Sequence, residues 1–332
     1  METLTGSTIE RRNEIMRLVP CCVPYFHPDY CNIMYQAERG GVPEFFLLRD
    51  DNRFVYYQYV KRRIADTILA APPDLYDVIT HFDYGGYYTN DRSLLPAFFE
   101  HFRAYCRSAG IVSEFMRFLP TYPHDYETMQ RYLTLRQVRD HVYIDLKDED
   151  FYKDFSGGRR NELSKSSKQE LHWEKSEDLS EFLPIYQATM QRRNAHDYFF
   201  FGRHILAQLI SAGIGEIWYS LKDGKRIGGC FVLKSDSAMY YFLSANSELS
   251  MECGSSTFLL YQIAIHYRAA KSLLYLGGGD EGVYKFKESF SRRRIPYHIG
   301  MAIHDEKAYA GLVDMTKRND NDFFPKYREK II

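Results

Sequence analysis

Hydrophobic residues in the first half of this chain recur at every third or fourth position in some segments and at every second position in others. The first spacing predicts helices over 29–38 and 95–109, and the second predicts strands over 44–48, 53–60 and 111–118. Three polar residues, Asp50 to Asn52, form the turn between the first two strands. The first half is therefore expected to mix helices with hairpins.

The second half repeats this alternation in a more regular order. A strand at 141–146 leads into the polar stretch 147–150, which we take as the domain junction. Helices are predicted beyond it at 156–169, 178–193, 202–212 and 255–270. Strands are predicted at 216–221, 226–233, 238–244, 273–276 and 297–304, the first three as a meander. This order resembles acyltransferases of the GNAT type, with the first half as a degenerate copy.

These elements define the expected fold class. We predict an α/β (α+β) protein with two tandem GNAT-like domains, each a mixed, mostly antiparallel sheet flanked by helices. The domains are expected at 1–146 and 147–332. A length of 332 residues is in keeping with two cores.

Composition narrows the class of protein further. Hydrophobic residues make up 45% and charged residues 26%, which indicates a soluble globular protein. A net charge of −1 gives no overall field to attract DNA or an anionic membrane. The six cysteines lack C-x-x-C spacing, which favours reduced thiols and a cytoplasmic protein without a metal site. We also expect neither a signal peptide nor a transmembrane segment.

The segment after the strand at 273–276 carries the strongest candidate chemistry. Gly277, Gly278 and Gly279 allow positive φ and close approach of the backbone to a ligand. Lys287 follows within a predicted helix, turned away from the apolar pair Phe286 and Phe290. A lysine beside a glycine turn suits a phosphate or a developing oxyanion.

Two other interpretations of this segment remain open. It can be a plain turn followed by an amphipathic helix. Gly277, Gly279 and Gly282 also match G-x-G-x-x-G, with Asp305 and Glu306 at the distance of a dinucleotide-binding acid. That fingerprint normally opens a doubly wound sheet, and here it lies near the end of the chain, which argues against an oxidoreductase.

Four short motifs, taken together, resemble one known family. They are the glycine turn with Phe286-Lys287, the segment Thr189 to Arg192 followed by Tyr198, the helix start Arg159-Arg160-Asn161, and Tyr84-Gly85-Gly86. In this order and spacing the chain resembles the FemABX-like aminoacyl and acyl transferases, over nearly its whole length. Characterised members attach an amino acid from aminoacyl-tRNA to a peptidoglycan precursor.

The resemblance implies a function. It implies a cytoplasmic N-acyltransferase that acts on an amine of a cell-envelope or polysaccharide precursor, either a small molecule or lipid-linked. Acyl-CoA or aminoacyl-tRNA would be the co-substrate, with no tightly bound cofactor, and peripheral membrane contact is allowed. The alternative is a non-catalytic module of the same fold that binds a nucleotide sugar or precursor.

The resemblance also implies roles for individual residues. Lys287 would stabilise the oxyanion, Phe286 would wall the acyl channel, and Tyr198 would act as an acid toward the leaving group. Substrate contacts are expected from Arg159, Arg160, Arg192, Tyr84, Gly278 and Gly279. Donor contacts are expected from Gly254, Ser255 and Ser256 at a helix start. This helix start lacks the usual basic-glycine pattern. For each group a purely structural role is the competing interpretation.

Overall fold

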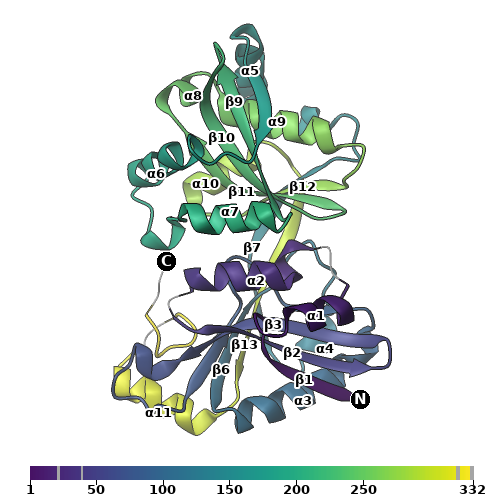
Figure 1. Cartoon of the computed structure of the whole chain (residues 1–332), viewed down its shortest axis with the longest axis vertical. Coiled ribbons are helices and arrows are strands. Elements are labelled where there is room, and N and C mark those ends of the chain that lie inside the picture. The colour runs from purple at the N-terminus through teal and green to yellow at the C-terminus, as the bar shows by residue number, and fades with distance from the viewer. Residues whose placement is uncertain (21–22, 39, 319–321, 330–332) are drawn as a thin grey trace. The chain divides into compact units, whose positions relative to one another are not determined.

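The computed structural model describes residues 1–20, 23–38, 40–318 and 322–329, and the chain forms two compact units (Figure 1). Unit 1 contains Met1–Cys21, Tyr25–Val138 and Tyr297–Ile332. Unit 2 contains Cys22–Pro24 and Arg139–Pro296. Unit 2 is thus inserted into the sequence of unit 1.

This division differs from the predicted domains 1–146 and 147–332. The chain leaves unit 1 within strand β7 (Thr134–Asp145) and returns within strand β13 (Arg294–Ile303). Residues from Tyr297 onward therefore complete unit 1. The polar stretch 147–150 is a turn that follows β7, and it suggested a junction because turns and linkers share the same composition.

Unit 1 is built on a mixed sheet with the strand order β1-β2-β3-β4-β6-β13, and β5 pairs with β3. The further strands are β1 (Glu2–Ser7), β2 (Val42–Asp50), β3 (Arg53–Arg63), β4 (Tyr76–Ile79), β5 (Tyr87–Thr89) and β6 (Ile111–Arg117). Its helices are α1 (Arg12–Leu18), α2 (Pro28–Met34), α3 (Leu95–Ser108), α4 (Tyr126–Met129) and α11 (Glu306–Thr316). Only β4 and β6 pair in parallel among the registers described for this unit.

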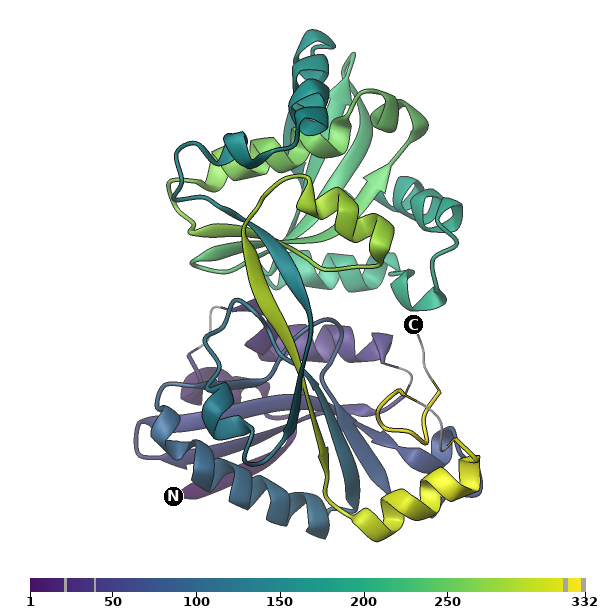
Figure 2. The ribbon, with the colours of Figure 1, turned by 180° about the vertical axis from the view of Figure 1, so that it is seen from behind.

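Alternate residues of β2 fill two separate cores in unit 1. Phe46 and Leu48 pack with α3 residues such as Phe98, whereas Phe45 and Leu47 pack with α1. Side chains alternate between the two faces of a strand, so both faces of this sheet are covered. Figures 1 and 2 show α2 on one face, and α3 and α11 on the other.

Unit 2 has the strand order β7-β12-β11-β10-β9-β8. Its other strands are β8 (His172–Ser176), β9 (Gly215–Lys222), β10 (Lys225–Lys234), β11 (Ala238–Asn246) and β12 (Leu273–Gly277). Its helices are α5 (Gly157–Lys168), α6 (Phe182–Arg192), α7 (Arg203–Ser211), α8 (Glu248–Glu252), α9 (Ser255–Tyr267) and α10 (Glu281–Glu288). Trp218 and Val232 pack with α9 in one core, while Phe231 meets Phe182 of α6 on the opposite face.

Most predicted elements lie within a few residues of their observed bounds, including the meander β9-β10-β11. The sequence analysis missed β1, β4, β5, β8, α1, α4, α8 and α11, and all of these except α11 have seven residues or fewer. Cys31, Cys106, Cys230 and Cys253 are free and buried, whereas Cys21 and Cys22 lie outside the described residues. Every helix in the described part of the chain is too short or too polar to cross a membrane.

Candidate functional site

The parallel strands β11 and β12 of unit 2 part after a short contact. They pair from Ala238 with Leu273 to Tyr240 with Tyr275, and β11 then continues alone to Asn246. Its other edge remains paired with β10 as far as Asn246. From Tyr241 onward, β11 therefore has one edge without a strand partner among the described residues. An open strand edge presents backbone N–H and C=O groups to an extended ligand.

The glycine turn follows β12 where the two strands have parted. Gly277 has φ +80° and Gly279 has φ +134°, so both positions favour glycine. Gly278 is restricted for another reason, because a Cβ atom there would lie 2.5 Å from Nε2 of His141. The sequence predicted that the backbone here approaches a ligand closely. At Gly278 the backbone instead approaches the imidazole ring of His141. Asp280 then caps α10 by accepting a hydrogen bond from Val283 N at 2.8 Å.

Lys287 is half-buried on α10, beside this opening. Its Nζ atom lies 5.8 Å from the centre of the Tyr241 ring. Burial raises the pKa of Tyr241, so its phenol stays protonated at neutral pH. Lys287 and Tyr241 therefore place an ammonium group and a phenol near the open edge of β11.

His141 of β7 lies in the same region. Its Nδ1 atom shares a hydrogen bond with Tyr275 Oη at 2.5 Å. Burial, followed by the positive charge of Lys287 and that of Arg139, lowers the pKa of His141 to about 3. The imidazole is consequently neutral at physiological pH and adds no charge beside Lys287.

Arg159, predicted to bind substrate, joins three helices of unit 2. Its guanidinium lies 4.6 Å from the ring centre of Phe286 and 5.1 Å from that of Phe290. It donates to Ser289 Oγ at 2.7 Å, Glu162 Oε2 at 2.6 Å and Thr257 Oγ1 at 3.2 Å. These contacts tie α5 and α9 to the helix that carries Lys287, so Arg159 orients α10.

The other basic side chains of α5 have internal or exposed positions. Arg160 donates to the carbonyl oxygens of Lys153, at 3.2 Å, and Phe155. Lys165 donates to the carbonyl oxygen of Glu252 at 2.9 Å, while Lys168 is exposed. The structure therefore gives Arg160 and Lys165 contacts that stabilise loops of unit 2.

The predicted donor-binding residues lie at the start of α9. Gly254 has φ +68° and precedes the helix without a side-chain cap. Ser255 Oγ is buried against Ser220 Oγ, and Ser256 Oγ donates to Asn246 Oδ1 at 2.6 Å. Thr257 Oγ1 donates to Glu162 Oε2 at 2.5 Å. The three hydroxyl groups of this helix start are thus engaged within unit 2, and a carboxylate lies beside it.

Asn246 connects the start of α9 to α6. Its carbonyl oxygen accepts hydrogen bonds from Arg192 Nη2 at 2.8 Å and Thr189 Oγ1 at 3.1 Å. Thr189 Oγ1 also accepts from Asn246 N at 2.9 Å. The structure therefore brings Arg192 and Ser256 together through one asparagine at the end of β11.

Two predicted residues lie on other segments. Tyr198 belongs to the short helix Asp197–Phe199, and its ring meets that of Phe199 edge-on at 5.4 Å. Tyr84 lies in unit 1, where it packs against Tyr25 at 5.4 Å and Tyr297 at 5.7 Å. The functional roles assigned to Tyr198 and Tyr84 stay predictions.

Sequence reasoning did not identify His141, Glu162, Tyr241 or Asn246. Three of them lie inside predicted strands or helices without any motif of their own. Asn246 gave the best available signal, since it is a polar residue where the third strand of the meander ends. The G-x-G-x-x-G interpretation does not hold, because β12 lies between parallel β11 and antiparallel β7, and Asp305 caps α11 in unit 1.

In unit 2 the meander β9-β10-β11 is followed by α9, β12 and α10, and the parallel strands β11 and β12 part after a short contact. This order and this parting define a GNAT-type fold. Residues 156–288 match the family described as "Acetyltransferase (GNAT) domain". A sequence comparison with curated proteins finds no significant match. The predicted α/β class with two GNAT-like units is confirmed, and the acyltransferase match lies entirely within unit 2.

Comparison with solved structures extends the likeness to both units. FemX aligns over 93% of this chain and 99% of its own, with a TM-score of 0.71 and 12% identity. The C-terminal domain of a protein assigned as a lysylphosphatidylglycerol synthetase from Agrobacterium fabrum aligns over 93% and 97%, with a TM-score of 0.60 and 15% identity. L-PGS from Bacillus licheniformis aligns over 76% and 81%, with a TM-score of 0.53 and 10% identity. The predicted resemblance to the FemABX-like family is confirmed at the level of the fold.

Proposed function

We propose that unit 2 is an N-acyltransferase that joins an acyl or aminoacyl group to an amine of a cell-envelope or polysaccharide precursor, in the cytoplasm. The observation that carries this proposal is the parting of β11 and β12 beside α10, the helix of Lys287. An acyl chain bound along the open edge of β11 would place its carbonyl carbon near Lys287 and Tyr241. The envelope precursor is proposed from the likeness to FemX.

The proposed reaction is an aminolysis. A neutral amine attacks the carbonyl carbon of an ester or thioester, so a C–N bond forms and the carbonyl oxygen becomes an oxyanion. The C–O or C–S bond then breaks, and the amine proton passes to the leaving group. The ammonium of Lys287 stabilises the oxyanion, a type of contribution worth about 3 kcal/mol. Tyr241, protonated because burial raises its pKa, is a second donor at this position.

A GNAT-type domain implies acyl-CoA as co-substrate, and the start of α9 is where its diphosphate would bind. Here the hydroxyl groups of Ser255, Ser256 and Thr257 bond to protein groups, and the Glu162 carboxylate lies against Thr257. Arg159 pairs with this carboxylate at 2.6 Å, so neither its guanidinium nor the three hydroxyl groups are available as donors to a diphosphate, and these side chains do not fit that part of CoA. The proposal therefore holds for an ester or a thioester donor and includes no step through CoA.

A binding and turnover experiment tests the proposal. The full chain is titrated with acetyl-CoA, free CoA, aminoacyl-tRNA and a UDP-linked peptide precursor, and its melting temperature and product formation are followed. Lys287→Ala should reduce turnover about 10²- to 10³-fold with ligand affinity retained.

The matched control is Lys285→Ala, because Lys285 is exposed on the same helix and pairs with Glu281 at 2.7 Å. It should leave turnover unchanged. If wild-type protein bound the precursor without transferring any group to it, the non-catalytic binding module would replace the enzyme. Equal turnover of the Lys287→Ala and wild-type proteins would remove Lys287 from the mechanism.

A further inference from the structure

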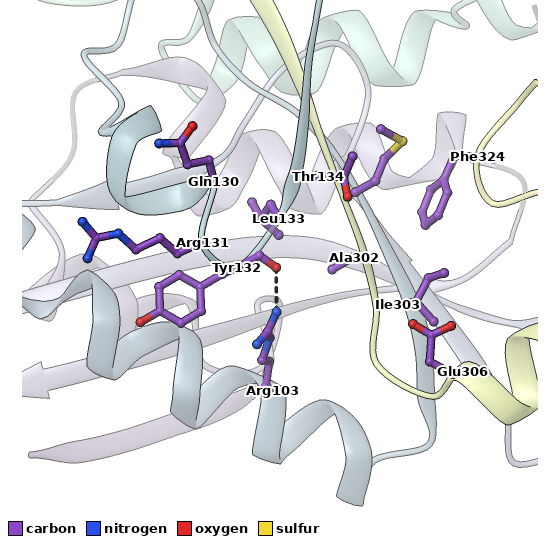
Figure 3. Close-up of a pocket in the computed structure, with 11 residues that line it drawn as sticks. Arg103, Gln130, Arg131, Tyr132, Leu133, Thr134, Ala302, Ile303, Glu306 and Phe324 are labelled. Carbon is purple, nitrogen blue, oxygen red and sulfur yellow. Dashed lines mark hydrogen bonds between the residues drawn. The ribbon is translucent and has the colours of Figure 1, made fainter.

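Unit 1 contains a cavity that the proposed acyl transfer does not use. It has a volume of about 400 Å³ and lies between α3, the segment that enters β7, β13 and the start of α11 (Figure 3). Volumes of this order are typical of sites for small organic molecules. All its lining residues belong to unit 1, so the cavity is described independently of unit 2.

One wall of the cavity is held rigidly by stacked side chains. The ring of Tyr132 is stacked on Phe99, with ring centres 4.6 Å apart and planes 9° from parallel. The guanidinium of Arg103 lies 5.4 Å from the Tyr132 ring centre and donates from Nη2 to the Tyr132 carbonyl oxygen at 2.8 Å. Figure 3 shows this bond from α3 to the segment before β7. Arg103 is thus fixed in place, with further N–H donors available for a ligand.

The opposite wall carries a negative charge. Glu306 is the first residue of α11, and Figure 3 shows its carboxylate directed toward Ile303. In the described part of the chain, neither Arg103 nor Glu306 has an ion-pair partner, and they do not pair with each other. Opposite charges on two walls of one cavity, both unpaired, suit a ligand that carries a charge of each sign.

The floor between these walls is apolar. Leu133 and Ala302 are buried in the core that contains α3, and Ile303 and Phe324 are half-buried beside the separate core that contains Tyr309. A small aliphatic group would be removed from water on this surface, at about 25 cal/mol per Å² of apolar area buried. The cavity therefore offers a cationic contact, an anionic contact and an apolar contact within one small volume.

We infer that this cavity binds a small zwitterion with an aliphatic body, of the chemical class of a free branched α-amino acid. Its carboxylate is held by the fork of Arg103, and its ammonium group by Glu306. Its side chain lies on Leu133, Ala302 and Phe324. The residues that line this cavity all belong to unit 1, whereas Lys287 and Tyr241 of the proposed acyl transfer belong to unit 2.

Calorimetric titration of the full chain tests this inference with three probes of the same shape. L-leucine carries both charges, 4-methylpentanoate lacks the ammonium group, and 3-methylbutylamine lacks the carboxylate. L-leucine should bind, and each analogue should bind about tenfold more weakly or worse, because charged hydrogen bonds are lost. No binding of L-leucine, or equal binding of either analogue, would overturn the inference.

Substitutions assign the two charges. Arg103→Gln and Glu306→Gln should each weaken L-leucine binding about tenfold or more. Arg107→Gln on α3 and Asp314→Asn on α11 are matched controls, because both residues are exposed and outside the cavity. Glu306 is exposed, so its substitution keeps the fold even where Arg103→Gln does not. Unchanged affinity in Glu306→Gln would exclude the zwitterion.

Discussion

Each unit contains one corresponding pair of parallel strands, which stays joined in unit 1 and parts in unit 2. In unit 1, the parallel strands β4 and β6 pair from Tyr76 with Ile111 to Ile79 with Phe115, and Gly85 still bridges to Phe118 beyond them. In unit 2, the corresponding strands β11 and β12 part after Tyr240 and Tyr275. One topology therefore gives a closed edge in unit 1 and an open one in unit 2.

An arginine closes the edge in unit 1. Arg117 Nη2, at the end of β6, donates to the carbonyl oxygens of Thr80 at 2.5 Å and His81 at 2.8 Å, which follow β4. The same nitrogen donates to Glu38 Oε1 at 2.6 Å. The helix that follows differs as well, because α3 begins with Leu95 and Pro96 where α9 begins with Ser255 and Ser256. A protein can thus retain a fold while internal groups occupy its ligand-binding edge.

The largest effect is expected when the negative charge that pairs with Arg117 is removed, because unit 1 then loses stability and unit 2 does not. Glu38 is buried, with 1% of its side chain exposed, so Glu38→Gln leaves a partly buried guanidinium without its counter-charge. We expect unit 1 to lose about 3–5 kcal/mol of unfolding free energy. Both tryptophans, Trp173 and Trp218, lie in unit 2. The midpoint of urea unfolding followed by circular dichroism should therefore fall to a lower urea concentration. The midpoint followed by tryptophan fluorescence, which reports on unit 2, should fall less.

The control for this substitution is Glu100→Gln, an exposed carboxylate on α3. It should move neither transition, because exposed charges contribute little to stability. If Glu38→Gln matched this control, the contact between Arg117 and Glu38 would not be what closes the edge.

Acid should destabilise unit 1 more than unit 2. Burial lowers the pKa of His81 to about 4 and that of His124 to about 3 in unit 1, and the pKa of His141 to about 3 in unit 2. Unfolded histidine binds a proton near pH 6.5, so between these values the unfolded chain holds more protons. The contribution of each histidine to the free energy of unfolding is therefore fully present above about pH 6.5. Below that pH it falls by about 1.4 kcal/mol per pH unit for each histidine.

At pH 5 the expected loss of unfolding free energy is about 4 kcal/mol for unit 1, from two histidines, and about 2 kcal/mol for unit 2, from one. Hydrogen exchange at pH 5 and pH 7, corrected for intrinsic rates, resolves the two units. Equal losses of protection in both units would contradict the assignment of two buried neutral histidines to unit 1.

The smallest expected effect concerns the charge at the start of α9. Glu162→Gln removes a carboxylate that is 42% exposed, so the gain in affinity for CoA should be modest, at about 1 kcal/mol or fivefold. Glu177→Gln, in the exposed loop between β8 and α6, is the control. Calorimetric titration with free CoA measures both. Unchanged affinity in Glu162→Gln would show that the carboxylate does not restrict this helix start.

The sequence was most informative where geometry is local. Gly277, Gly278 and Gly279 are expected to allow positive φ, and Gly277 and Gly279 adopt it, because this freedom depends on each residue's own backbone. The meander also follows from local patterns, because its strands are separated by short polar turns. In contrast, four of the five residues of β8 are polar and none is buried, so it becomes a strand only by pairing with β9. Propensity gives little indication of such edge strands.

The side-chain partners of the site could not be predicted for the same reason. Arg159 was selected as a ligand-binding arginine, yet its contacts are with Ser289 and Thr257, which are distant in the sequence. The open edge of β11 is equally a property of the pairing register. A sequence pattern indicates that a strand forms but not where its pairing with a neighbour ends.

The passage of the chain out of unit 1 along β7 and back along β13 also determines the order in which the protein can be assembled on the ribosome. When β7 has been synthesised, unit 1 still lacks β13 and α11, whereas the rest of the long segment of unit 2, as far as Pro296, emerges next without interruption. The last part of unit 1 is fixed by Arg328, which donates to Asp77 Oδ2 at 2.8 Å, beside Arg62 on Oδ1 at 2.8 Å. Residues 139–296 can thus fold during translation before unit 1 is complete, because unit 1 must wait for β13, α11 and Arg328.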